Sequence, residues 1–269
     1  MNPRNSNWLS LQSLIWSKNS NKYGNVIALT GPRFLHQKTL VHELLSEEIH
    51  ELDFIEMEPG VDGAREAIKF AESKPLSGDI KVIFVDNADR LSEPAQDAIL
   101  KISESPPDSL IIILIAYDSG LLQPALSSRI RTELRFFPFS KEEMYEYSSS
   151  LIIPTSEVAI SMACGLPELY SLLIEKSDYE DLHNTIISVI KLEHSILSKP
   201  PKIISDLENG NSQIRDAVIH VIHNACKLHM DNKNIIIPIL KFCGVLSNSS
   251  SANAEIHWMR MISDTKCSL

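Results

Sequence analysis

The residues with the clearest potential for chemistry are Lys38 and Thr39, at the start of an expected helix. A phosphate-binding loop uses glycines so that backbone N–H groups can surround the phosphates, followed by Lys for the phosphates and Ser or Thr for magnesium. Here Gly31 lies one residue too far from Lys38, because Pro32 stands where the first glycine belongs, and Gln37 replaces the second glycine. The pattern predicts a degenerate phosphate loop; an ordinary strand-to-helix turn is the alternative.

A second candidate group ends the expected strand over residues 81–86. Asp86 stands where a carboxylate could coordinate magnesium, and a cap or turn residue is the equally weighted alternative. The next residue is Asn87. ATPases with a phosphate loop and a strand-end aspartate of this type normally carry a glutamate there, which accepts a proton from the attacking water. Because an amide cannot accept that proton, we expect even a bound nucleotide to be hydrolysed poorly.

Apolar strands and helical segments alternate in the first half of the chain. Strands are expected over 26–30, 54–57, 81–86, 110–116 and 132–137, and helices over 38–50, 64–73 and 94–104. The strands are continuous apolar runs, which is typical of a parallel sheet covered by helices on both faces. The sequence therefore predicts an α/β fold in this half.

Only helical segments are expected after residue 140. Short ones cover 141–149, 156–164 and 168–175; longer ones cover 182–197 and 213–230, followed by a shorter apolar piece near 235–246 and a tail helix near 254–262. The chain is thus expected to divide into an α/β domain at 1–139, a small helical lid at 140–178 and a helical C-terminal domain at 179–269.

Composition limits the classes of protein that fit. The 269 residues are 43% hydrophobic and 22% charged, as in ordinary globular proteins, and the net charge is −10. An acidic chain is poorly suited to hold a nucleic-acid backbone by itself, since that requires clustered Lys and Arg. The four cysteines show no CxxC spacing and suggest free thiols in a reducing cytosol.

Targeting and membrane signals are not expected either. Residues 1–10 lack the basic-then-apolar pattern of a signal peptide, and the longest apolar run, residues 110–116, is too short for a bilayer. We therefore expect a cytoplasmic protein without membrane contact.

Four segments together resemble the bacterial AAA+ clamp-loader subunits, and among them the delta-prime type of DNA polymerase III. The segments are Phe54-Ile-Glu-Met-Glu-Pro59, Lys81-Val-Ile-Phe-Val-Asp-Asn-Ala-Asp-Arg-Leu-Ser92, Ala95-Gln-Asp-Ala-Ile-Leu-Lys-Ile-Ser-Glu-Ser-Pro-Pro107 and Leu121-Leu-Gln-Pro-Ala-Leu-Ser-Ser-Arg129. The resemblance covers residues 5–140 well and the helical remainder by architecture alone. It implies an AAA+ P-loop-type sheet, a lid and an all-α collar that joins a ring of five subunits.

The resemblance also implies a role for Ser128 and Arg129. In that family a Ser-Arg-Cys element presents its arginine to ATP held by the adjacent subunit; here it reads Ser128-Arg129-Ile130, and Arg131 is the rival. An arginine supplied in trans is worth about 10³–10⁵ in rate in other NTPases. The implied partners are a gamma/tau-type ATPase and a delta-type subunit, with the sliding clamp and primed DNA reached through the complex.

Other departures from the family pattern favour a subunit without its own ATP hydrolysis. Tyr117 replaces a polar sensor, and Glu168 in Gly165-Leu-Pro-Glu168 replaces an arginine that would touch the γ-phosphate. We expect Gly31, Lys38, Thr39 and Asp86 to be remnants of a nucleotide site. No cofactor is expected, and no zinc, because no cysteine precedes Cys164.

A metal site on one helix is set aside, and two alternative functions are kept. His220, His223, Cys226 and His229 recur every third residue, but such a set drifts through about 180° around a helix and cannot face one metal ion. The chain could instead be an active gamma/tau-type clamp-loader ATPase, or an AAA+-like adaptor unrelated to replication. As a delta-prime-type subunit it would have no catalysis of its own, although it would belong to a DNA-directed DNA polymerase holoenzyme.

Overall fold

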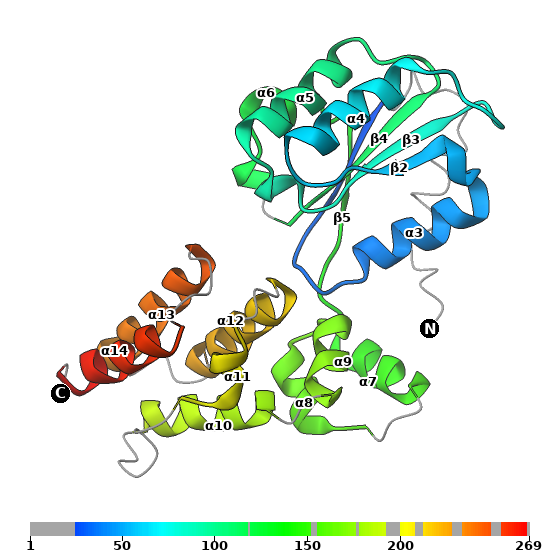
Figure 1. Cartoon of the computed structure of the whole chain (residues 1–269). Helices are drawn as coiled ribbons and strands as arrows, with labels where there is room; N and C mark the ends of the chain where they lie inside the picture. The colour runs from blue at the N-terminus through cyan, green and yellow to red at the C-terminus, as the bar shows by residue number, and fades with distance from the viewer. Residues whose placement is uncertain are drawn as a thin grey trace. The chain divides into compact units, whose positions relative to one another are not determined.

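The computed structural model of the chain describes residues 25–117, 119–151, 155–175, 178–191, 200–207, 212–227, 233–248 and 254–267. The segment 1–10, examined above for a signal peptide, lies outside these residues. The chain folds as two compact units, residues 1–138 and 139–269 (Figure 1). The separation of the second unit into a lid and a collar stays a prediction.

The first unit is built on a five-stranded, fully parallel sheet. The strands are β1 (Val26–Thr30), β2 (Phe54–Glu56), β3 (Lys81–Val85), β4 (Leu110–Ala116) and β5 (Thr132–Arg135). Their order across the sheet is β2-β3-β4-β1-β5. All residues of β1, β3 and β4 are buried, as expected for strands covered on both faces. The predicted α/β fold is confirmed.

Helices cover both faces of this sheet (Figure 1). They are α3 (Gln37–Glu48), α4 (Val61–Glu72), α5 (Glu93–Glu104) and the short α6 (Pro124–Ser127), with single turns η1 (Glu51–Asp53), η2 (Ala88–Arg90) and η3 (Ser119–Leu121). Alanines of α4 and isoleucines of α5 pack with Ile83 and Ile112 in one apolar cluster. On the other face, His42 of α3 contacts Phe54 and Phe84 edge-on.

Helix α4 begins three residues before the predicted start at residue 64. Gly60, with φ 109°, caps it, and Gly63 lies buried in its first turn. A Cβ on Gly63 would approach the Glu58 carbonyl oxygen to 2.0 Å, so only glycine fits there. Gly63 therefore marks a close approach of two backbone segments, in a first helical turn that the predicted start at residue 64 left out.

The second unit is entirely helical over its described residues. Its helices are α7 (Lys141–Ser150), α8 (Glu157–Ala163), α9 (Pro167–Glu175), α10 (Asp178–Ile190), α11 (Lys202–Asp206), α12 (Ser212–Lys227), α13 (Lys233–Asn248) and α14 (Ala254–Cys267). Ser140 and Glu143 form a capping box that fixes the start of α7. The sequence missed α11, and it made α13 too short because that helix continues beyond both ends of the apolar run at 235–246.

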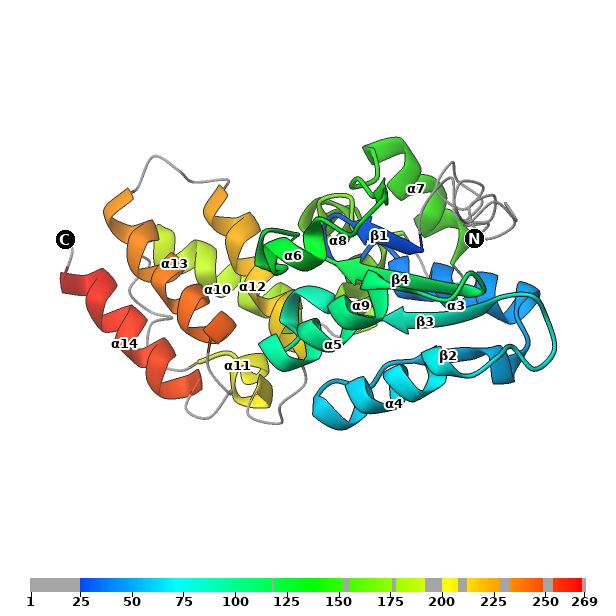
Figure 2. The same cartoon turned by 90° about the horizontal axis from the view of Figure 1, so that it is seen from above.

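The last helices of this unit pack on one another, with α11 in contact with α10 and α14. Helix α10 contacts α12, α12 contacts α13, and α13 contacts α14, so these helices lie side by side (Figure 2). The ring of Phe242 on α13 meets Trp258 on α14 edge-on, with 5.6 Å between ring centroids. Among the described residues, no helix is long and apolar enough to cross a membrane.

Candidate functional site

The loop after β1 begins with a glycine that the fold requires. Gly31 has φ 130°, and a Cβ there would lie 2.4 Å from the carbonyl oxygen of Phe136. The residue after Thr30 therefore packs directly against the backbone that follows β5. Gly31 serves this approach, one position away from where a phosphate loop would need its first glycine.

The interior of the loop is filled by Gln37. Its side-chain amide donates to the Pro32 carbonyl at 2.7 Å, and its side-chain oxygen accepts from the Leu35 N–H at 3.3 Å. The residue is 1% exposed. Phe34 is buried nearby in the chain and takes a left-handed backbone, with φ 68°. At least one loop N–H thus bonds to the protein's own side chain, at the place where a phosphate would compete for it.

Arg33 crosses from the loop to the ends of β3 and β4. Its guanidinium donates to the side-chain oxygen of Asn87 and lies 3.5 Å from an Asp89 carboxylate oxygen. It also stacks over the Tyr117 ring, with 4.0 Å from Cζ to the ring centroid. Asn87 and Tyr117 are two of the residues that depart from the family pattern, and one arginine contacts both.

Lys38 is held by two carboxylates. Its Nζ lies 2.6 Å from Glu56 Oε1 and 3.7 Å from Asp86 Oδ2. Burial lowers the pKa of Lys38, but the hydrogen bond and charge of Glu56 and the charge of Asp86 outweigh it, so the pKa is raised. His42 Nε2 lies 3.0 Å from the other Glu56 oxygen. Thr39, which stands at the magnesium-ligand position of a phosphate loop and was expected to be a remnant, is exposed.

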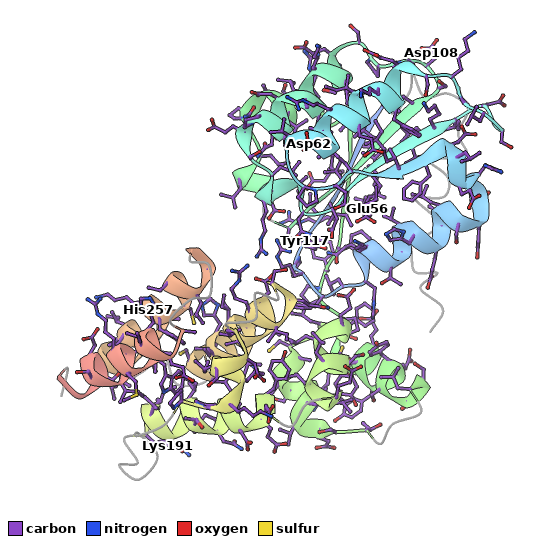
Figure 3. All side chains as sticks on the ribbon, viewed as in Figure 1. Glu56, Asp62, Asp108, Tyr117, Lys191 and His257 are labelled. Atoms are coloured by element: carbon purple, nitrogen blue, oxygen red, sulfur yellow. The ribbon has the colours of Figure 1, made fainter. Side chains whose placement is uncertain are left out.

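Asp86 lies at the carboxyl end of β3, as predicted. Burial raises its pKa, and Lys38 partly offsets this effect. The Tyr117 hydroxyl donates to Asp86 Oδ1 at 3.4 Å. Glu56 and Tyr117, labelled in Figure 3, belong to the same end of the sheet, since each stands at the carboxyl end of its strand. A magnesium nucleotide would have to compete with Lys38 and Tyr117 for the Asp86 carboxylate.

Sequence reasoning brought Lys38 and Asp86 together correctly but overlooked Arg33, Glu56 and Asp89. Arg33 and Asn87 are 54 residues apart, and only the order of strands brings them together. Gln37 was noted as a missing glycine, not as the residue that fills the loop. Within the described residues, no cluster of His, Cys, Asp and Glu is arranged to hold a metal ion.

Ser128 and Arg129 follow the short helix α6. The Ser128 hydroxyl donates to the Ala125 carbonyl at 2.7 Å, and the Arg129 N–H donates to the Leu126 carbonyl at 3.0 Å. Leu126 is fully buried and anchors this turn on the core of the unit. The Arg129 side chain is 43% exposed, and its Nη2 lies 3.7 Å from Glu104 Oε1 at the end of α5. An arginine therefore projects from a rigid base.

The second unit holds the other residues that the sequence singled out. Glu168 is half-buried in the first turn of α9. On α12, His220 is half-buried, His223 is exposed and Cys226 is buried, so the three side chains differ in solvent exposure. His229 lies outside the described residues. Burial lowers the pKa of His220, with a smaller contribution from His223.

This geometry gives the first unit the α/β fold of AAA+ proteins. Residues 14–139 match the family model described as "DNA polymerase III, delta subunit". The match covers just under half of the chain and shows that residues 14–139 are similar to this family.

Individual relatives are similar over about the same share of the chain. A replication factor C small subunit of Thermococcus kodakarensis is 34% identical over 133 residues, which span 45% of this chain and 15% of that protein. The corresponding protein of Archaeoglobus fulgidus is 38% identical over 112 residues, 39% of this chain and 34% of that protein. The chain thus spans well under half the length of these curated relatives.

A solved structure extends the likeness to the whole chain at the level of fold. The DNA polymerase III gamma subunit-related protein of Thermotoga maritima superposes with a TM-score of 0.57 at 14% identity. The alignment covers 98% of this chain and 100% of that one.

Proposed function

We propose that the chain is a non-hydrolysing subunit of a DNA polymerase III clamp loader, which places the sliding clamp on primed DNA. In this proposal Arg129 acts on ATP bound by a neighbouring subunit. The observation that carries the proposal is the Gln37 side chain, which bridges Pro32 and Leu35 inside the loop.

The loss of the subunit's own hydrolysis is supported by the way charges are paired around the loop. Lys38 is committed to Glu56 and Asp86, and Arg33 to Asp89. A bound triphosphate would have to break these contacts and also move Gln37, and each buried hydrogen bond contributes about 1 kcal/mol. Asn87 cannot act as the general base for water, so no catalysis of the chain's own is proposed.

The role of Arg129 is supported by its exposure and its rigid base on Leu126. A guanidinium keeps its charge at all physiological pH values and can hold two phosphate oxygens at once. Such a group, placed by a neighbour, neutralises the charge that develops during phosphoryl transfer. Ser128 belongs to the same element and fixes its turn through Ala125.

The proposed partners follow from the family. They are a gamma/tau-type ATPase that holds the nucleotide, a delta-type subunit, and the clamp and primed DNA reached through the complex. The net charge of −10 fits a subunit that does not hold DNA by itself. The proposed location is the cytoplasm, and ATP would be bound by the neighbours.

Reconstitution with the candidate clamp-loader subunits tests the role of Arg129. Arg129→Ala is expected to leave assembly intact and to lower clamp- and DNA-stimulated ATP turnover by about 10²-fold or more at one partner site. Arg131→Ala is the matched control, because Arg131 is also exposed and lies two residues away. Unchanged turnover with Arg129→Ala, or an equal loss with Arg131→Ala, would contradict the assignment.

The retained Lys38, Thr39 and Asp86 favour one alternative, an active gamma/tau-type ATPase. Equilibrium binding of labelled ATP with magnesium to the purified chain separates the two. Micromolar affinity together with turnover would establish the ATPase. Isolation of the native complex without any clamp-loader or polymerase component would favour the unrelated adaptor.

A further inference from the structure

The turn between α8 and α9 binds the chain where it enters the second unit. Helix α8 ends at Ala163, and Cys164 and Gly165 then have positive φ angles of 50° and 83°. The Leu166 N–H closes the turn by donating to the Ala163 carbonyl at 3.0 Å. The Gly165 carbonyl accepts from the N–H of Phe139, the first residue of the unit, at 2.8 Å. The entering chain is therefore tied to this turn.

The end of α8 is also bound by Asn224 of α12. The Asn224 side-chain amide donates to the carbonyls of Ser161 and Met162, with 3.2 Å to each oxygen. The last four carbonyls of a helix have no partner within it, so these two need a cap or water. Asn224 is only 8% exposed, and α12 contacts α8. A side chain 62 residues beyond Met162 therefore caps this helix.

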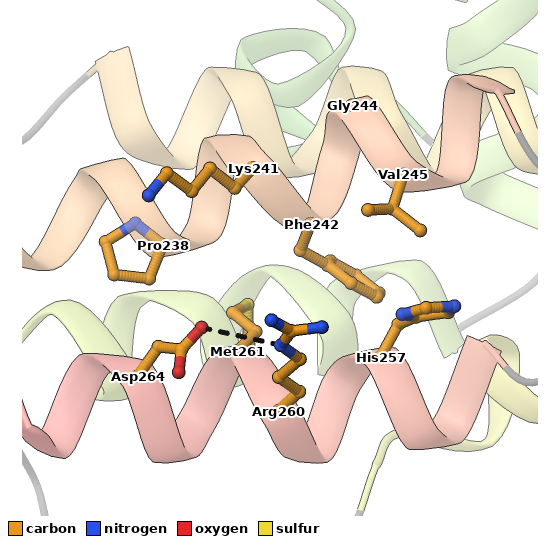
Figure 4. Close-up of a pocket in the computed structure, with 9 residues that line it drawn as sticks. All are labelled: Pro238, Lys241, Phe242, Gly244, Val245, His257, Arg260, Met261 and Asp264. Carbon is orange, nitrogen blue, oxygen red and sulfur yellow. Dashed lines mark ion pairs between the residues drawn. The ribbon is translucent and has the colours of Figure 1, made fainter.

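The contact between α13 and α14 is less directional. Phe242 and Met261 line a groove between these two helices (Figure 4). The ion pair drawn there, between Arg260 and Asp264, joins two residues of α14 and does not reach α13. Apolar contacts are non-directional, whereas a hydrogen bond weakens steeply as its angle changes. The two bonds of Asn224 thus fix α12 against α8 more narrowly than apolar packing does.

We propose that Asn224 is a latch that couples α12 to the entry of the second unit. The coupling runs from Asn224 through the end of α8 to Gly165, and from Gly165 to Phe139. While both bonds of Asn224 are made, α12, the turn and the entering chain move as one piece. When they break, the turn is free to open and Phe139 loses its fixed acceptor. A displacement of α12 thereby reaches the chain that joins the two units, and this role does not depend on Arg129.

Amide hydrogen exchange in the full-length chain, resolved by NMR, tests this coupling. Asn224→Ala removes the amide, and Asn224→Asp keeps its shape without a donor. We expect both variants to accelerate exchange of the Phe139 and Leu166 amides by about tenfold or more, because the turn opens more often. His223→Ala is the matched control, since His223 is the exposed neighbour of Asn224 on α12. It should change both rates by less than about twofold.

Amides of α14 serve as the internal reference, because a general loss of stability would accelerate exchange throughout the unit. The latch is overturned if Phe139 and Leu166 exchange at the wild-type rate in both Asn224 variants. It is also overturned if their rates rise no more than those of α14, since Asn224 would then contribute only to overall stability. An equal acceleration in His223→Ala would overturn it as well.

Discussion

The guanidinium of Arg129 lies 3.7 Å from the carboxylate of Glu104, which ends helix α5. Both side chains are about half exposed, so water screens the pair and its contribution to stability is small. The contact nevertheless orients the Arg129 side chain. A phosphate that binds Arg129 would have to replace the negative charge of Glu104.

Replacing Glu104 with Gln removes that charge and keeps the shape of the side chain. In a reconstituted complex we expect Glu104→Gln to keep or raise partner ATP turnover, because Arg129 no longer has a competing carboxylate. The free energy of unfolding should change by less than about 0.5 kcal/mol. Glu93→Gln, an exposed residue at the other end of α5, is the control. A loss of turnover as large as that of Arg129→Ala would show that Glu104 has a different role.

Gln37→Gly tests whether the loop is closed by its own side chain. The loss of two buried hydrogen bonds should lower the free energy of unfolding by about 1–3 kcal/mol, measured by chemical denaturation. Gln37→Ala removes the same bonds without the added backbone freedom of glycine, so it should show most of the loss. No destabilisation in either variant would mean that Gln37 does not hold the loop.

Gly31→Ala tests the approach of the loop to the chain after β5. The new Cβ would meet the Phe136 carbonyl oxygen at 2.4 Å, and the φ of 130° is unfavourable for alanine. We expect the free energy of unfolding to fall by more than about 2 kcal/mol. Gly78→Ala, where the nearest atom is 3.9 Å away, should cost less than about 1 kcal/mol. Equal effects at the two positions would refute the steric argument.

Asp86→Asn should have an effect on stability that depends on pH. Because burial raises the pKa of Asp86 above its ordinary 3.8, the charged form is disfavoured in the folded protein. The stabilising contribution of this group is therefore complete below pH 3.8 and is lost as the pH rises through the raised pKa. Asn resembles the protonated acid, so the variant should gain stability relative to wild type as the pH rises from about 4 to about 7.

Denaturation curves at several pH values measure this gain. Asp97→Asn, an exposed aspartate on α5, is the control and should show no comparable trend. A variant whose stability relative to wild type falls with rising pH would indicate that the ion pair with Lys38 outweighs the burial of Asp86.

Strands β1, β3 and β4 could be predicted because each is an apolar run between turn signals; β5 is not such a run, and it ends two residues before the predicted end at 137. Asp86 could be placed at the end of its strand for the same reason. The contacts of Arg33 could not be predicted, because Asn87 and Asp89 become its neighbours only through the strand order. Glu56 was likewise paired with Lys38 by the packing of α3 against β2, which no local pattern indicates.

The predicted boundaries were wrong at the start of α4 and at both ends of α13. Gly63 permits the start of α4 against the Glu58 carbonyl, although glycine usually weakens a helix. The predicted segment at 235–246 already included Pro238, and α13 differs from it by two residues at each end. At Gly63 the tertiary contact outweighed the intrinsic propensity of the residue.

The two outermost strands of the sheet are its shortest, with three residues in β2 and four in β5 against seven in β4. Such short edge strands offer few free backbone N–H and C=O groups to another chain. This protects the isolated unit from edge-to-edge aggregation. Other proteins that join this unit cannot do so by extending its sheet over any useful length. Partner proteins must therefore bind this unit through side-chain contacts. Single substitutions on its helices and loops can then change binding specificity without disturbing the sheet.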